Sequence, residues 1–119
     1  MPLIQIHLHR EVYDASHKDI GRAIHEAQIE ALGIPEDDMF QVFSPHEPGE
    51  LKFDPGYNDV DRRDLVLIRV TAVHMYSPAT KQTFFRAVVD RLEPLGIRPD
   101  DVLISLTENG FEDWYAGRL

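Results

Sequence analysis

Pro2 is the residue whose position in the chain suggests chemistry most directly. It follows the initiator methionine and precedes an alternating segment, Leu3 to His9. Removal of Met1 turns Pro2 into a secondary amine, which acts as a base or as a nucleophile that forms an iminium with a carbonyl. Either role needs an amine pKa near neutral pH, which apolar surroundings and nearby cations favour because they destabilise the ammonium. A proline at the start of a strand also needs no function, so both hypotheses stay open.

His7 and His9 form the second candidate site, because they project from the same face of the predicted strand. This spacing suits two ligands of one metal ion. A third ligand would have to come from elsewhere in the chain, and no HxxxH or HExxH pattern supplies it. Polar residues on an exposed or subunit-facing sheet surface explain the pair better, and we expect no metal site.

The other common catalytic motifs are absent, and the serines and carboxylate pairs have a structural explanation. The chain has no cysteine, which excludes a thiolate nucleophile and a zinc–thiolate site. No GxSxG, GxGxxG or GxxxxGK[ST] motif is present, and Ser16 and Ser77 are each explained as helix caps. The carboxylate pairs at 37–38 and 100–101 lie between a glycine and a strand, where solvated turn residues are the simplest explanation. A serine hydrolase and a nucleotide-phosphate site are therefore not expected.

The composition indicates one acidic globular domain. The 119 residues carry a formal net charge of −9, which disfavours nucleic acid and anionic membranes as partners. The chain contains no apolar run of about 18 residues and no signal-peptide pattern at its start. We therefore expect a cytoplasmic protein whose ligand is a small molecule, with no cofactor.

The chain repeats itself at an offset of 63 residues. The segment GIPEDD at 33–38 recurs as GIRPDD at 96–101, and the patterns around it recur in the same order. The sequence therefore predicts a single domain, 1–119, made of two pseudo-repeats at about 2–63 and 64–119.

Each repeat shows the order strand, helix, strand. The first helix is expected to begin after Ser16, and the second after Ser77, where Pro78 takes the first helical position. Gly33 and Gly96 fit the left-handed residue that ends a helix. The expected strands are Leu3–His9, Met39–Ser44, Leu65–Val73 and Val102–Thr107.

This order predicts an α+β fold in which duplicated βαβ units form a four-stranded sheet with two helices on one face. The other face mixes polar side chains such as Gln5, Arg69 and Thr71 with the apolar Leu67 and Val73. A mixed, uncovered face of this kind favours self-association.

The acidic segment 45–64 is the one long irregular stretch. It contains Pro-Gly turn signals at 48–49 and 55–56, on either side of the short run Leu51–Phe53. We expect an extra hairpin there, within a functional or disordered loop.

Several stretches of the chain together resemble the tautomerase superfamily. These stretches are Met1–Ile4 entering the first strand, GIPEDDMFQVFSPHEPG at 33–49, Ser77–Lys81, and GIRPDDVLISLTENGFEDW at 96–114. They span almost the whole chain, and Pro2 together with the ending at 108–114 is the most specific part. The branch most similar is the malonate semialdehyde decarboxylase-like group. The resemblance implies a homotrimer of tautomerase-like subunits.

The resemblance also implies roles for individual residues. Pro2 matches the catalytic N-terminal proline of the superfamily, and Asp38 matches an aspartate that tunes this amine or activates water. Trp114 matches an aromatic residue in the pocket wall. His74 and Tyr76 stand where the decarboxylases have an arginine pair that holds the substrate carboxylate. An imidazole and a phenol cannot reproduce the two parallel bonds of an arginine fork.

We therefore expect an isomerase of the tautomerase superfamily in which Pro2 moves a proton during keto–enol tautomerisation of a small 2-keto or enol acid. In this hypothesis His74 and Tyr76 contact the substrate oxygen, while Trp114 excludes water. One alternative is a hydratase or decarboxylase of a small 3-oxo acid. The other is a non-catalytic binding module that keeps the fold.

Overall fold

The computed structural model describes residues 2–119, which form one four-stranded sheet and two α-helices. The strands are β1 (Leu3–His9), β2 (Gln41–His46), β3 (Val66–Val73) and β4 (Val102–Asn109). The helices are α1 (Arg10–Leu32) and α2 (Pro78–Leu92). Short 3-10 segments lie at Tyr57–Asp59, Glu93–Leu95, Pro99–Asp101 and Phe111–Asp113.

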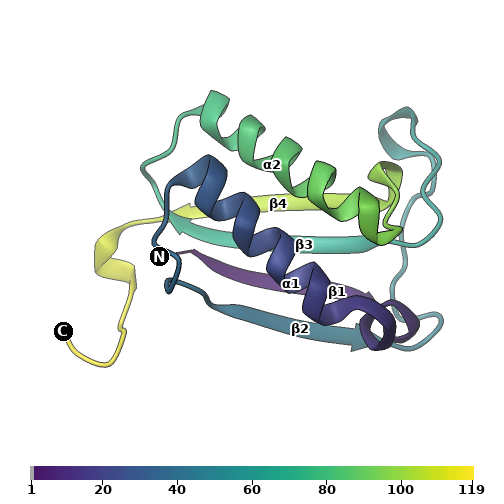
Figure 1. Ribbon diagram of the computed structural model, residues 1–119, viewed down its shortest axis with the longest axis horizontal. Coiled ribbons are helices and arrows are strands. Elements are labelled where there is room, and N and C mark those ends of the chain that lie inside the picture. The colour runs from purple at the N-terminus through teal and green to yellow at the C-terminus, as the bar shows by residue number, and fades with distance from the viewer. Residues whose placement is uncertain (1) are drawn as a thin grey trace.

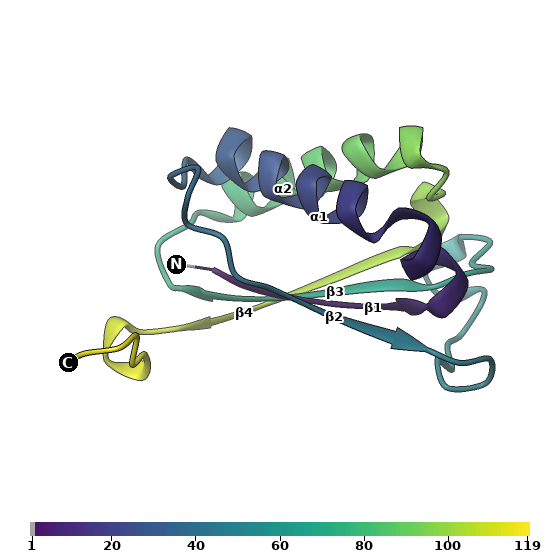
Figure 2. The same ribbon diagram turned by 60° about the horizontal axis from the view of Figure 1, so that its bottom comes forward.

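The sheet has the strand order β2-β1-β3-β4 (Figure 1). β1 pairs in parallel with β2, β3 pairs in parallel with β4, and the two halves meet where β1 and β3 run antiparallel. Both helices cover the same face of the sheet, and the other face is bare in the single chain (Figure 2). The predicted α+β fold of duplicated βαβ units is therefore confirmed.

The core lies between the helices and the sheet face that they cover. In β1 the side chains of Ile4, Ile6 and Leu8 are fully buried, whereas Gln5 and His7 between them are half-buried on the other face. Each such apolar side chain stabilises the fold by roughly 1.5–3 kcal/mol when buried. The other strands and helices contribute the remaining core residues, which include Ile20, Ala23, Ile24, Ala27, Val66, Ile68, Val70, Phe84, Val88 and Leu92.

The start of α1 differs from the sequence prediction. The helix begins at Arg10, directly after β1, so Ser16 lies inside the helix and is not its cap. The residue in the N-cap position is His9, whose side chain makes no capping hydrogen bond. No glycine or proline separates His9 from Ser16, and Val12 and Tyr13 pack against the core. Burial of these two side chains stabilises the added turns without a cap.

The predicted end signals of the helices are otherwise confirmed. Ser77 accepts a hydrogen bond from the Thr80 N–H at 3.1 Å, and Pro78 is the first residue of α2. Gly33 and Gly96 have φ values of 68° and 88°, in the left-handed region, although a 3-10 segment separates α2 from Gly96. Within residues 2–119, neither helix has the length and apolar character needed to cross a membrane. The cytoplasmic location stays a prediction.

Several features of the strands and loops differ from expectation. β2 lies two residues later than predicted, and β4 continues to Asn109. The expected hairpin at Leu51–Phe53 does not form. Arg62 organises this loop instead: its buried guanidinium donates to the carbonyl oxygens of Asp54 at 2.8 Å and Tyr57 at 3.4 Å. A charged side chain of this kind leaves no periodic pattern in the sequence.

Candidate active site

Three connecting segments surround the start of β1. The α1–β2 loop, the β3–α2 loop and the end of β4 all lie near the N-terminal end of the chain (Figure 1). The Ile4 N–H donates to the carbonyl of Phe40 at 3.0 Å, which fixes the α1–β2 loop beside β1. The His74 N–H donates to the carbonyl of Asn109 at 2.8 Å, which joins the β3–α2 loop to β4. These bonds hold the two loops and the end of β4 at the end of the sheet where β1 begins.

The strand register places Pro2 in a row with two other side chains. Leu3 pairs with Thr71, so Pro2 continues the register beside Ala72, and Ala72 pairs with Glu108 on its other side. Alternation puts all three side chains on the helix-facing side of the sheet. Neighbouring strands lie about 4.8 Å apart, so Glu108 lies about 10 Å from Pro2 across the small Ala72 side chain. Pro2 itself is buried, an environment that favours a neutral amine.

Asp38 and Tyr76 come from different loops but lie within electrostatic range of each other. The pKa of the Tyr76 hydroxyl is raised, first because the side chain is partly buried and then because the Asp38 carboxylate is negative. The phenol therefore stays protonated at neutral pH, and it can donate a hydrogen bond to a substrate oxygen. The structure thus brings together two of the side chains that the sequence analysis singled out.

The second repeat shows how an aspartate at this position acts. Asp101, the counterpart of Asp38, is 4% exposed and accepts the backbone N–H groups of Arg63 at 2.7 Å and Asp64 at 3.1 Å. Arg98 donates to the same carboxylate at 3.2 Å. Asp101 is therefore a buried structural residue, and the solvated turn expected for it is wrong. By the same repeat, Asp38 lies beside the start of β1, where Pro2 is found.

We expect the two aspartates to separate function from stability. Asp101→Ala removes the acceptor of two N–H groups and should lower the free energy of unfolding by about 1–3 kcal/mol while leaving kcat intact. Asp38→Ala should lower kcat and change stability less. Urea denaturation and steady-state kinetics on both variants measure the difference. An Asp38→Ala protein with unchanged kcat and a matching loss of stability would make Asp38 structural as well.

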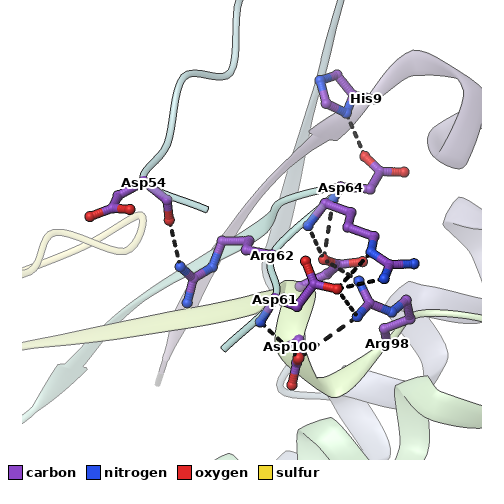
Figure 3. A network of polar contacts seen from close by, with 9 residues as sticks. His9, Asp54, Asp61, Arg62, Asp64, Arg98 and Asp100 are labelled. Carbon is purple, nitrogen blue, oxygen red and sulfur yellow. Dashed lines mark hydrogen bonds and ion pairs between the residues drawn. The ribbon is translucent and has the colours of Figure 1, made fainter. Parts of the chain in front are cut away.

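The far end of the sheet holds a cavity of about 520 Å³ that is lined by His9, Arg10 and Asp64, among others. Two of its side chains pair with neighbouring carboxylates: His9 with Asp64 (Figure 3) and Arg10 with Glu47. His7, the other half of the candidate metal pair, instead lies 2.9 Å from His46. No cluster of three potential ligands occurs within residues 2–119.

His74 contacts Glu108, which in turn binds Lys81, and the sequence analysis assigned a role to neither charged residue. Its Nδ1 atom lies 2.5 Å from Glu108 Oε2, and the Lys81 ammonium lies 2.5 Å from Glu108 Oε1. The sequence does contain a pattern from which Glu108 could have been singled out. In β4 it continues the helix-facing positions of Ile104 and Leu106, so it is a carboxylate on an otherwise apolar face. Such a residue needs a partner.

Trp114 is anchored at the same end of the sheet by Asn109, the residue whose carbonyl also accepts from the His74 N–H. Its indole N–H donates to the Asn109 side chain at 2.8 Å, and its side chain is half-buried. The C-terminal segment that carries it projects away from the sheet (Figure 2). The role of Trp114 in excluding water stays a prediction.

Two family models, each described as "Tautomerase enzyme", match residues 38–117 and residues 2–55. The probable tautomerase YusQ of Bacillus subtilis (strain 168) is 37% identical over 98% of this chain and 94% of its own length. Probable tautomerase YrdN of the same organism is 29% identical over 98% of this chain and 92% of its own. A crystal structure of malonate semialdehyde decarboxylase is 34% identical, with a TM-score of 0.89, and covers 98% of this chain and 91% of that one.

With its duplicated βαβ units and with these matches along its whole length, the chain belongs to the tautomerase superfamily. The predicted family, its malonate semialdehyde decarboxylase-like branch and an enzyme of the isomerase type are confirmed. The individual roles of Pro2, Asp38, His74, Tyr76 and Trp114 stay predictions.

Proposed function

We propose that this protein catalyses keto–enol tautomerisation of a small 2-keto or enol acid with the amine of Pro2 as the proton-transferring group. The observation that carries the proposal is the position of Pro2. It directly precedes β1 in a buried position, at the end of the sheet where the two loops that bear Asp38 and Tyr76 lie (Figure 1). Buried apolar surroundings keep an amine pKa low enough for it to gain and lose protons near neutral pH.

The remaining groups act on the substrate oxygen and on the amine. In the direction from enol to ketone, the Pro2 ammonium gives a proton to carbon while the hydroxyl group loses its proton and becomes the carbonyl. Tyr76 donates a hydrogen bond to this oxygen. The Asp38 carboxylate stabilises the ammonium form of Pro2 because opposite charges attract. Trp114 excludes water from the bound substrate.

A hydratase or decarboxylase activity toward a small 3-oxo acid is the second candidate. One structure of malonate semialdehyde decarboxylase, 34% identical to this chain, is described in terms of decarboxylase and hydratase activities. His74 and Tyr76 replace the arginine pair that the resemblance leads us to expect, so a carboxylate meets less fixed positive charge here. We therefore place tautomerisation first.

The test compares two forms of the same protein. Intact mass spectrometry separates preparations that retain Met1 from those in which Pro2 is the first residue. We expect the processed form to accelerate ketonisation of phenylenolpyruvate, and the form with Met1 to be inactive because an amide nitrogen is not basic. A processed protein with no rate above buffer on enols and on 3-oxo acids would favour a non-catalytic binding module.

We further propose a homotrimer in which the bare sheet face lies toward the threefold axis. On that face Val42 and Leu103 are 48% and 40% exposed beside the exposed Arg69, and a second copy would bury them. Light scattering at micromolar concentration should give a mass near three times 13.7 kDa. A clean monomer under these conditions would contradict this assembly.

A further inference from the structure

Glu108 connects three elements at the Pro2 end of the sheet. It lies in β4, it accepts from Lys81 of α2, and it contacts His74 of the β3–α2 loop. The side chains of Glu108 and Lys81 are 23% and 20% exposed, whereas His74 is 79% exposed. The carboxylate and ammonium are therefore fixed beneath the imidazole, whose outer edge is accessible.

The protonation state of Glu108 determines which nitrogen of His74 carries hydrogen. The pKa of the Glu108 carboxyl is lowered, chiefly by the hydrogen bond from Lys81 and also by that from His74. An ionised carboxylate only accepts hydrogen bonds, so His74 Nδ1 must be the donor. In a neutral imidazole the other nitrogen, Nε2, then has a lone pair and no hydrogen. A neutral His74 is therefore an acceptor at its accessible edge.

We propose that Glu108 is a positioning residue that holds His74 with Nε2 unprotonated, so that His74 takes the hydroxyl proton of a bound enol. This inference rests on the proposed function of Pro2. The row from Pro2 through Ala72 to Glu108 supports it, since it sets the proline and the His74–Glu108 pair on opposite sides of one small side chain. Ala72 itself is buried, so one core side chain separates the two groups at this end of the sheet.

The proton balance of this step is complete. His74 Nε2 takes the proton from the enol hydroxyl, and the O–H electron pair forms the carbonyl. The C=C electron pair takes a proton from the Pro2 ammonium at carbon. The products are a ketone, a neutral Pro2 amine and a His74 imidazolium, and proton exchange with water restores both groups.

This arrangement also defines the part of the substrate that faces His74. Lys81 and Glu108 neutralise each other, so a neutral His74 adds no fixed positive charge at this position. A hydroxyl group matches an unprotonated Nε2, whereas a carboxylate would place two acceptors against each other. The inferred substrate is an enol whose hydroxyl group, rather than a carboxylate, contacts His74.

The first readout requires no activity. In full-length protein with 15N-labelled histidine, two-bond nitrogen–proton NMR correlations identify the protonated ring nitrogen of His74, assigned by its loss in His74→Gln. We expect hydrogen on Nδ1 and none on Nε2 when the ring is neutral. A neutral ring with hydrogen on Nε2 would overturn the inference, whatever Pro2 does.

The second readout separates positioning from packing. Glu108→Gln should lower kcat for enol ketonisation by about 10- to 100-fold with little change in KM, while Glu93→Gln, an exposed carboxylate after α2, should change neither. In a His74→Gln background, Glu108→Gln should cause no further loss, because its effect passes through the imidazole. An equal further loss in that background would contradict the inference. Full retention of kcat/KM in Pro2→Ala would instead count against the proposed function.

Discussion

Pro2→Ala should lose most of the catalysed ketonisation of phenylenolpyruvate, by about 100-fold or more, the lower end of the range for a positioned acid–base group. Alanine is small, so Met1 is still removed and a primary amine remains at the N-terminus. Some activity therefore persists, with a shifted pH profile because the titrating group has changed. Stopped-flow or steady-state absorbance kinetics, after intact mass has confirmed processing, measure the effect.

The control for this variant is the unfolding free energy. Pro2 precedes β1 and lies outside the paired residues of that strand, so Pro2→Ala should change the free energy of unfolding by about 1 kcal/mol, the central value for single substitutions. A full retention of kcat/KM across pH would contradict catalysis by the amine. A loss of rate that accompanies a large loss of stability would assign the effect to folding.

Phe84→Ala should destabilise the fold strongly, lowering the free energy of unfolding by about 3–5 kcal/mol. Phe84 has 0% exposure and packs between α2 and the sheet within the core. Its removal loses apolar burial and leaves a cavity that the surrounding side chains fill incompletely. Urea denaturation at a fixed protomer concentration gives the difference, since any oligomer makes stability depend on concentration.

Phe111→Ala is the matched control, because the same side chain is 78% exposed near the C-terminus. We expect it to change the free energy of unfolding by less than about 0.5 kcal/mol. Equal effects at Phe84 and Phe111 would show that the core is not where the structure places it.

The parts of the fold with strong periodicity could be predicted from the sequence. β1 alternates cleanly, and its bounds, Leu3–His9, agree with the prediction. Ser77 and Pro78 marked the start of α2 because a cap and a first-turn proline act locally. Ser16 gave the same local signal, but the helix start predicted there was wrong. The helix begins earlier because the residues before Ser16 pack against the core. Local signals are reliable where tertiary packing does not oppose them.

The candidate site was predicted only in part, for a physical reason. Pro2 was proposed from its position after Met1 and from the resemblance, and Asp38 from the resemblance alone; both roles stay predictions. The link between His74, Glu108 and Lys81 depends on strand pairing, because it joins residues up to 34 positions apart. The burial of Asp101 has the same origin, since its partners Arg63 and Asp64 lie in the segment that enters β3.

The most direct test of the central claim is a titration of the Pro2 nitrogen. In processed protein labelled with 15N-proline, the Pro2 signal is identified by its absence in Pro2→Ala, and its chemical shift is followed against pH. We predict a transition near neutral pH that coincides with a limb of the kcat/KM profile for enol ketonisation. A transition only in the alkaline range of ordinary secondary amines, with no matching limb in the rate profile, would contradict the account.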